Sequence, residues 1–280
     1  MRRSLVWAGA ARPARTATAV AVVVAFALPA ALVVVGATRP PGTSVLSGTN
    51  WLRAPARLDA LRIASAQIDL PTLLRNSLLV TLLAVPVTVL LASWAGTALA
   101  LTGPQARRTL VAVAVLALVT PTSVLWVPRV VIARRLGLAD RLPVLAAPAL
   151  MATSATFVIL LALATARLPR SLVDAARIEG MGPLRTWWRV VVPLTRGPLV
   201  TVAVLAFVAR WADLVEPQLL LASPERRTLP LGLAVLRTDE VSQAPIALAA
   251  AVVATIPPVV VFALGARWLL GATHDRRGRP

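Results

Sequence analysis

The chain has 280 residues, of which 58% are hydrophobic and 14% are charged, and its mean hydropathy is +0.79. A soluble domain of this length carries far more charged surface, so the composition indicates an integral membrane protein. The formal net charge is +18. We expect these positive side chains to face anionic lipid headgroups, because the hydropathy argues against a nucleic-acid partner.

The residue types that the chain lacks exclude several kinds of chemistry. It has no cysteine and a single histidine, His274, in a polar tail, which excludes disulfides, thiolate zinc sites, cysteine nucleophiles and a histidine relay in the apolar part. All 29 basic residues are arginines, and without lysine neither a Walker A loop nor a Schiff base can form. We therefore expect no metal site, no bound cofactor and no covalent catalysis in this chain.

Six apolar stretches are long enough to cross a bilayer, which takes about 20 helical residues. We predict an all-α membrane domain over residues 17–272, with a basic N-terminus (1–16) and a charged tail (273–280). The first stretch could be a cleaved secretory signal, but its apolar run exceeds the usual 7–15 residues, which favours an uncleaved span. The six predicted spans are Ala17–Ala37, Ser77–Leu101, Leu110–Val127, Pro143–Ala164, Leu199–Leu221 and Ala244–Leu270.

The arginines between the spans indicate the orientation. With the N-terminus inside, sixteen arginines lie in cytoplasmic segments and twelve in outer segments. The positive-inside rule then favours a cytoplasmic N-terminus, and six spans return the C-terminus to the same side. The long first outer loop, residues 38–74, is expected to form a short surface helix between Arg53 and Ile68.

The cytoplasmic stretch of residues 168–198, between spans four and five, has the pattern of two short helices. Ser171 and Asp174 have the S-x-x-D spacing of a helix start, with an acid that complements the helix dipole. This spacing predicts a short cytoplasmic helix of about two turns at Leu172–Glu179.

The residues that follow predict where this helix stops and the next begins. Gly180 can adopt the left-handed conformation that ends a helix. Pro183 suits the first position of a second helix, which we expect to run to Val192 and to end at Pro193.

The first of these helices has a surface suited to a partner protein. Ala175 and Ala176 give it a low, smooth flank, with Arg177 and Glu179 as charged contacts at the rim. A flank of this kind favours docking into a groove on another protein. The local pattern fits equally well a loop that lies at the lipid headgroups.

The same stretch resembles the EAA motif of bacterial ABC-importer permeases, E-A-A-x-x-D-G with I-x-L-P nine residues later. Here D-A-A-R-I-E-G begins at Asp174, and Pro193 lies nineteen positions after Asp174, as in the motif. Val190 and Val192 stand at the positions of the motif's Ile and Leu. In that family the short helix is a coupling helix that sits in a cleft of the ATPase subunit. The resemblance therefore implies an ATPase-coupling role for Asp174, Ala175, Ala176, Arg177, Glu179, Gly180 and Pro193.

Further segments between about residues 70 and 265 resemble carbohydrate permeases of the maltose-permease MalG type. Each segment is short, and their joint occurrence makes the match specific. They are LLRNSLLVTLL (73–83), GLAD (137–140), LPRSLVDAARIEG (168–180), FVARWADLVEPQLLL (207–221) and TLPLGL (228–233).

The chain also departs from the family pattern at several positions. Asp174 replaces the usual Glu, and Met181 and Gly182 stand where Ala and Ser are common. Ala212 replaces the Asn that usually follows the span-five tryptophan, here Trp211. The charged tail lacks the family's short Gly-rich ending. These departures leave the coupling geometry intact but weaken the assignment of a sugar.

The resemblance implies one half of the transmembrane pathway of an importer in the bacterial cytoplasmic membrane. The implied partners are a second permease subunit, two ATP-binding subunits that hold ATP and Mg²⁺, and an extracytoplasmic solute-binding protein. The implied solute is a mono- or oligosaccharide, with a polyamine, a phosphonate or another polar solute as the alternative. Two other classes are disfavoured because the sequence does not show their patterns. An ion-coupled secondary transporter would show inverted repeats and broken spans. A membrane-embedded enzyme would cluster acids or histidines within its spans.

Five polar or aromatic residues are candidates for lining the translocation pathway. Arg210 lies near the middle of span five, where a charge costs about 2.5–3.5 kcal/mol, and Asp213 is placed to pair with it. Trp211 could offer its ring to a sugar or sit in an interfacial belt, and Glu216 lies toward the outer end of the span. Asn76 suits a helix cap better than a ligand contact.

Overall fold

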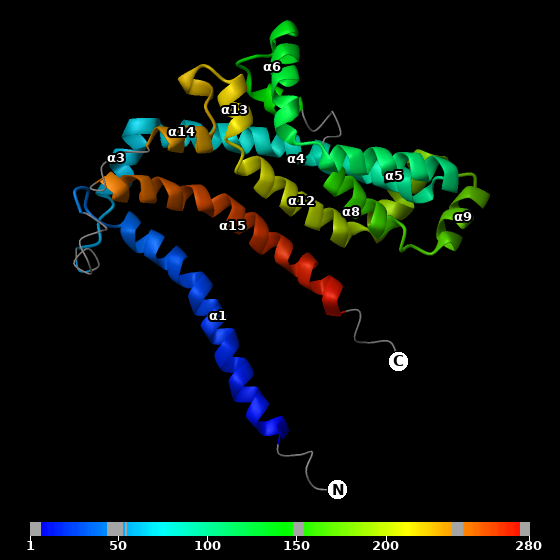
Figure 1. The fold of residues 1–280 in the computed structure, drawn as a ribbon, viewed down its shortest axis with the longest axis horizontal. Helices are drawn as coiled ribbons and strands as arrows, with labels where there is room; N and C mark the ends of the chain where they lie inside the picture. Colours follow the sequence, from blue (N-terminus) through cyan, green and yellow to red (C-terminus); the bar gives the residue numbers. More distant parts are fainter. Residues whose placement is uncertain (1–6, 44–52, 54, 148–153, 237–242, 275–280) are drawn as a thin grey trace. The chain divides into compact units, whose positions relative to one another are not determined.

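The computed structural model describes residues 7–43, 53, 55–147, 154–236 and 243–274. Figure 1 shows the chain as a ribbon, and in these described residues every regular element is helical, with no strand. The chain divides into two compact units, which are Met1–Leu70 with Leu233–Ala254, and Pro71–Gly232 with Thr255–Pro280. Helix α15 (Ala244–His274) contributes residues to both units.

The first unit contains the N-terminal helix and the predicted surface helix. Helix α1 (Trp7–Ala37) begins ten residues before the expected span, and its side chains from Thr16 to Leu32 are exposed, as suits contact with lipid. Helix α3 (Asp59–Ile68) confirms the short helix expected in the first loop. Asp59 in its first turn complements the helix dipole.

The second unit is built around helix α4 (Leu70–Leu101), which packs closely on α8 (Ala155–Thr165). A Cβ atom on Gly96 would lie 2.8 Å from the backbone nitrogen of Ala162 and 2.9 Å from the carbonyl oxygen of Val158. Glycine is therefore required at this crossing, because any side chain would push the two backbones apart.

The other helices along the chain between α4 and α15 are shorter, and several of them form bent pairs. Among the residues that the structure describes, three continuous helices are long and apolar enough to cross a membrane, and counting each bent pair as one span gives up to six. The bends measure 91°, 82° and 85°. The elements are α5 (Pro104–Val119), η1 (Thr122–Leu125), α6 (Trp126–Arg135), η2 (Leu142–Ala146), α9 (Arg170–Ile178), α10 (Pro183–Thr186), η3 (Trp187–Val191), α11 (Val192–Leu194), α12 (Arg196–Trp211), α13 (Val215–Leu220), η4 (Pro224–Arg226) and α14 (Leu229–Val235).

These bends correct the predicted third span, Leu110–Val127, which is not one straight helix. Helix α5 ends at Val119, and Thr120 has an extended backbone with ψ 119°. Pro121 explains the break, because a proline disfavours helical geometry in the residue before it and supplies no N–H for the next turn. The chain then turns by 91° into η1 and α6.

The predicted fourth and fifth spans are also interrupted. Of Pro143–Ala164, the structure shows a 3₁₀ turn at its start and α8 at its end, and residues 148–153 lie outside the described part. Of Leu199–Leu221, α12 ends at Trp211 and α13 begins at Val215. Asp213 accounts for this second break, because its carboxylate accepts the backbone N–H of Glu216, at 3.3 Å, in competition with helical pairing.

Helix α9 ends as the sequence predicts but begins differently. Its first residue is Arg170, and Ser171 lies inside the helix rather than capping it, so the predicted cap was wrong. At its other end Gly180 has φ +74°. The N–H of Gly180 donates to the Arg177 carbonyl, and that of Met181 to the Ala176 carbonyl, both at 2.9 Å, which is a Schellman closure.

The second short helix extends past its predicted end. Pro183 is its first residue, as predicted, but α10, η3 and α11 continue to Leu194 and include Pro193. The π-helical η3 lies directly before Pro193, where an α-helix would lose the hydrogen bond to the Arg189 carbonyl. The chain then turns by 85° into α12.

Two glycines in this loop give a matched test of the turn. Gly180→Ala should lower the free energy of unfolding by about 1 kcal/mol, because alanine is strained at positive φ, although no atom lies within 4 Å of the added Cβ. Gly182→Ala is the control, since Gly182 has φ −66° and equally open surroundings. Denaturant unfolding in detergent measures both. Equal effects would contradict the assigned role of Gly180.

Candidate functional site

Helix α9 has a buried face and an outward face. Val173 and Ala176 are each 4% exposed and pack toward the rest of the unit. Ser171, Ala175 and Ile178 lie on the opposite side, at i, i+4 and i+7, and all three are exposed. Ile178 is 88% exposed, so the outward face carries a large apolar side chain in open solvent.

This arrangement changes the expected docking flank. We predicted that Ala175 and Ala176 both form it, but Ala176 is buried, so only Ala175 is available to a partner. Its neighbours Glu179 and Gly180 are exposed, as is Pro193 at the end of the second helix. The outward face thus consists of small and apolar residues with one acid at its edge.

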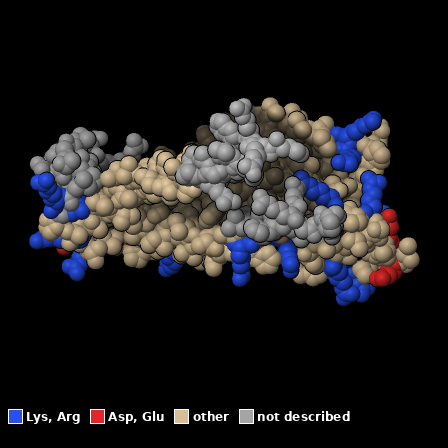
Figure 2. Space-filling model, turned by 90° about the horizontal axis from the view of Figure 1, so that it is seen from below, with Lys and Arg blue, Asp and Glu red and all other residues tan. Residues whose placement is uncertain are grey.

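The charged residues of α9 are exposed and contribute little to its stability. Asp174 and Arg177 form an ion pair at 3.5 Å, with side chains 61% and 62% exposed. A pair this open to solvent contributes about 0–1 kcal/mol. Figure 2 shows acidic and basic side chains next to each other at the end of the molecule where α9 lies in Figure 1.

The helix after α9 presents apolar side chains that the sequence analysis did not single out. Leu184 is 58% exposed and Trp188 is 63% exposed. Both border an open hollow with Pro183 and Trp187. Their spacing of four residues on a basic helix was the signal that could have identified them. Exposed apolar clusters of this kind mark contacts with a partner or with lipid.

A single tryptophan connects this region to the long helix α4. The Trp187 indole N–H donates to the Ser93 hydroxyl at 3.0 Å, and both residues are buried. The Trp187 ring lies 6.3 Å from that of Trp94 and 5.7 Å from that of Trp188, both tilted. The loop is therefore attached to α4 by a hydrogen bond and aromatic packing.

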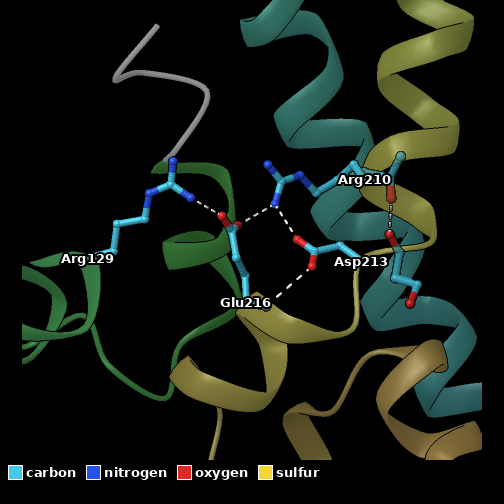
Figure 3. A network of polar contacts seen from close by, with 6 residues as sticks. Arg129, Arg210, Asp213 and Glu216 are labelled. Carbon is cyan, nitrogen blue, oxygen red and sulfur yellow. Dashed lines mark hydrogen bonds and ion pairs between the residues drawn. The ribbon is translucent and has the colours of Figure 1, made fainter. Parts of the chain in front are cut away.

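The second candidate region is a cluster of four charged side chains, shown in Figure 3. Arg210 Nη1 lies 3.0 Å from Asp213 Oδ2 and 2.7 Å from Glu216 Oε2. The other Glu216 oxygen accepts from Arg129 Nη1 on α6. The cluster therefore joins α6, α12 and α13.

The four charges balance, and their side chains are 10–20% exposed. The predicted pair of Arg210 with Asp213 is confirmed at 3.0 Å. Arg129 was not predicted, because it lies 87 residues from its partner Glu216 and no local pattern relates them.

The space around this cluster is small. A hollow of about 90 Å³ borders Arg210 and Asp213, with Thr88 and Ser154 as polar neighbours. Small-molecule sites usually measure about 300–1,000 Å³, so this hollow is too small for a sugar. In this conformation the geometry favours the structural alternative, in which the charges hold three helices together.

Trp211 and Asn76 are both buried, and each has a partner within the chain. Trp211 is 6% exposed, and its ring stacks on that of Phe207 with the ring centroids 5.6 Å apart, so the chain itself covers the ring in this conformation. Asn76 lies inside α4 and is 1% exposed, so the predicted helix cap was wrong. Its amide nitrogen donates to the carbonyls of Glu225 and Arg227, at 2.8 and 3.0 Å, and fixes that loop.

Asp140 holds the same loop from a second side. Its carboxylate accepts the backbone N–H groups of Ala222 and Ser223, at 3.0 Å each, and the Ser223 hydroxyl at 2.5 Å. The hydrogen bonds from Ser223 lower the pKa of Asp140 to about 2, so the carboxylate remains charged at physiological pH. Among the described residues no group of three or more His, Cys, Asp and Glu side chains could hold a metal ion.

Comparison with known proteins gives a consistent result. Residues 88–274 match the model of the family described as binding-protein-dependent transport system inner membrane component. The chain is 28% identical over 195 residues to the arabinooligosaccharides transport system permease protein AraQ of Halalkalibacterium halodurans, which covers 70% of this chain and 69% of that protein. It is 34% identical over 206 residues to the putative ABC transporter permease protein ORF1 of Streptomyces antibioticus, covering 73% and 89%.

Two further matches agree with these. The lactose transport system permease protein LacG of Rhizobium radiobacter is 25% identical over 207 residues, covering 74% of this chain and 75% of that protein. A crystal structure of a bacterial ABC transporter involved in the import of the acidic polysaccharide alginate matches with a TM-score of 0.71 and 20% identity. It covers 90% of this chain and 95% of that one, and it establishes the fold.

The charge cluster predicts a specific pattern of stabilities. Glu216→Gln should lower the free energy of unfolding by about 3 kcal/mol, because it leaves two largely buried arginines with one acid. The double variant Arg129→Met, Glu216→Gln should lose less stability than the single variant, because the remaining charges of Arg210 and Asp213 balance. The exposed Glu225→Gln is the control and should stay within about 0.5 kcal/mol. Denaturant unfolding in detergent measures all three, and a neutral Glu216→Gln would rule out the structural role.

Proposed function

The chain belongs to the family of binding-protein-dependent transport system inner membrane components, and on this premise we propose that it forms half of the pathway of a sugar importer. As a family member it is a multi-pass transport permease of the bacterial cytoplasmic membrane. The proposed solute is a mono- or oligosaccharide. The names of the relatives, which refer to arabinooligosaccharides and lactose, support this solute class.

We further propose that ATP hydrolysis takes place in partner chains and reaches this chain through α9. The partners are two ATP-binding subunits, which would hold ATP and Mg²⁺, a second permease subunit and an extracytoplasmic solute-binding protein. The outward face of Ser171, Ala175 and Ile178 supports the docking role. It is small and apolar, and it lies opposite the face that packs on the chain itself.

The internal contacts of the loop supply a path for the motion. Val173 and Ala176 on the buried face anchor α9, and Gly180 fixes its end. The bond from Trp187 to Ser93 connects the following helix to α4. A partner that displaces α9 would therefore move α4 as well, because these contacts are packed or hydrogen-bonded rather than loose. ATP-driven closure of the partner could thus tilt the spans between inward-open and outward-open states.

The proposed orientation places both termini and α9 in the cytoplasm. The excess of arginine in those segments supports it, because positive loops are retained inside. The loop around Ala222 would then face outward, toward the solute-binding protein.

The docking role predicts a selective loss of coupling. Ile178→Asp should reduce stimulated ATPase activity and sugar uptake at least tenfold in proteoliposomes of the assembled transporter, because a charge replaces the apolar contact. Leu136→Asp is the control; Leu136 is 65% exposed and lies outside this loop. Normal uptake by Ile178→Asp would contradict docking through this face.

The same proteoliposomes distinguish the substrate classes. Uptake of labelled oligosaccharide should depend on ATP and persist when ionophores collapse every ion gradient. Uptake that required the gradient would indicate a secondary transporter. Transport of a polyamine or phosphonate, with no oligosaccharide uptake, would replace the proposed solute.

The absence of cysteine from the sequence allows a direct test of orientation. In intact cells, a membrane-impermeant thiol reagent should label the variant Ala222→Cys and leave Ala175→Cys unlabelled until the membrane is opened. Both positions are exposed in the chain itself, and the cells express the chain without its ATP-binding subunits, which would otherwise cover Ala175. Labelling of Ala175→Cys from outside would reverse the proposed topology and remove α9 from the ATPase.

A further inference from the structure

A groove of about 990 Å³ lies between the end of α4, the length of α5 and one flank of α9. This flank is distinct from the outward face of α9. It consists of Arg170, Val173, Asp174 and Arg177, spaced at i, i+3, i+4 and i+7 along one stripe. The groove therefore does not include Ser171, Ala175 or Ile178 of the outward face, although Asp174 and Arg177, to which the family resemblance gives a coupling role, do line it.

The polar end of this groove has an unbalanced positive charge. Arg107 and Arg108 line it from α5, and Arg170 and Arg177 line it from α9. The one acid in the lining, Asp174, already pairs with Arg177. Within the described part of the chain, Arg107, Arg108 and Arg170 have no ion-pair partner.

The two helix starts at the groove increase this positive potential. Neither α5 nor α9 has an acid in its first turn. Arg107 and Arg108 lie close to the start of α5, and Arg170 is the first residue of α9, where the helix dipole disfavours a positive charge. An anion bound between these side chains would offset both the arginine charges and the dipoles.

The other end of the groove is apolar. Val111, Val115, Leu116 and Val119 of α5 line it, and α5 has no buried residue. This wall extends about 12 Å from Val111 to Val119, at 1.5 Å per residue. Hydrocarbon lying along the wall would cover apolar surface that the chain itself leaves open.

We propose that this groove binds an anionic phospholipid, with its phosphate between the arginines and its acyl chain along α5. The charge complementarity selects an anionic headgroup over a zwitterionic one. The apolar wall selects a lipid over free phosphate, which would leave that wall uncovered. A basic pocket at the end of a membrane helix is a recognised type of headgroup site.

The test is lipid binding by the full-length chain, which does not depend on transport. The purified protein is mixed in detergent with phosphatidylglycerol or phosphatidylcholine, and bound lipid is counted by native mass spectrometry. Phosphatidylglycerol should be preferred. The double variant Arg107→Gln, Arg108→Gln should bind it about 25-fold more weakly, at roughly fivefold for each arginine removed.

A second arginine pair gives a matched control. Arg134→Gln, Arg135→Gln removes two adjacent exposed arginines from the last turn of α6, outside the groove, and should leave binding unchanged. If the two double variants lost the same amount of phosphatidylglycerol binding, the loss would reflect net charge alone, and the proposed site would be wrong.

Two further measurements separate lipid from other occupants. Val115→Asn should weaken phosphatidylglycerol binding while the arginines remain, because it interrupts the apolar wall. Inorganic phosphate at millimolar concentration should not displace the lipid. Full displacement by phosphate, or a groove protected by a second permease chain in the assembled complex with no lipid bound, would overturn the proposal.

Discussion

The structure depends on one constraint, which is that polar groups within a membrane must find partners inside the protein. Three of the predicted spans are interrupted, and an interrupted helix leaves backbone groups without their helical partners. The balanced cluster around Arg210 and Glu216 ties together three helices at one such interruption. Asp140 and Asn76 hold the loop beyond it through its backbone N–H and carbonyl groups. At the break between α12 and α13, the Asp213 carboxylate accepts the Glu216 N–H, so a side chain supplies a hydrogen bond that the interrupted helix lacks.

The internal contacts of the α9 region make it suited to transmitting a displacement. A loop that only joined two spans would need no buried tryptophan and no closed helix end. Here Gly180 fixes the end of α9, and Trp187 connects the next helix to Ser93 on α4. The close crossing at Gly96 then joins α4 to α8. A displacement of α9 would therefore reach α4 and α8 through direct contacts.

Local chemistry predicted the local features, and contacts distant in sequence were missed. Apolar runs located the helices that could cross a membrane but not the breaks within three of the predicted spans. The backbone needs of Gly180 and Pro183 correctly placed the end of one helix and the start of the next. Nothing near Arg129 in the sequence indicates a partner 87 residues away. The same holds for Asn76, whose carbonyl partners lie about 150 residues further along. Burial of Ala176 likewise depends on how α9 meets the next helix, which the motif alone does not state.

The two flanks of α9 suggest how lipid and nucleotide could act on one element without competing. The outward face around Ile178 is free for a partner, while Arg170 and Arg177 point to the groove beside α5. A lipid phosphate held there would attract α9 toward α5. The lipid and the docked partner would then each favour a particular position of α9, and their effects would add. Both therefore act on one short helix. If one transport state binds the anionic lipid more tightly than the other, a higher content of that lipid in the membrane would favour that state.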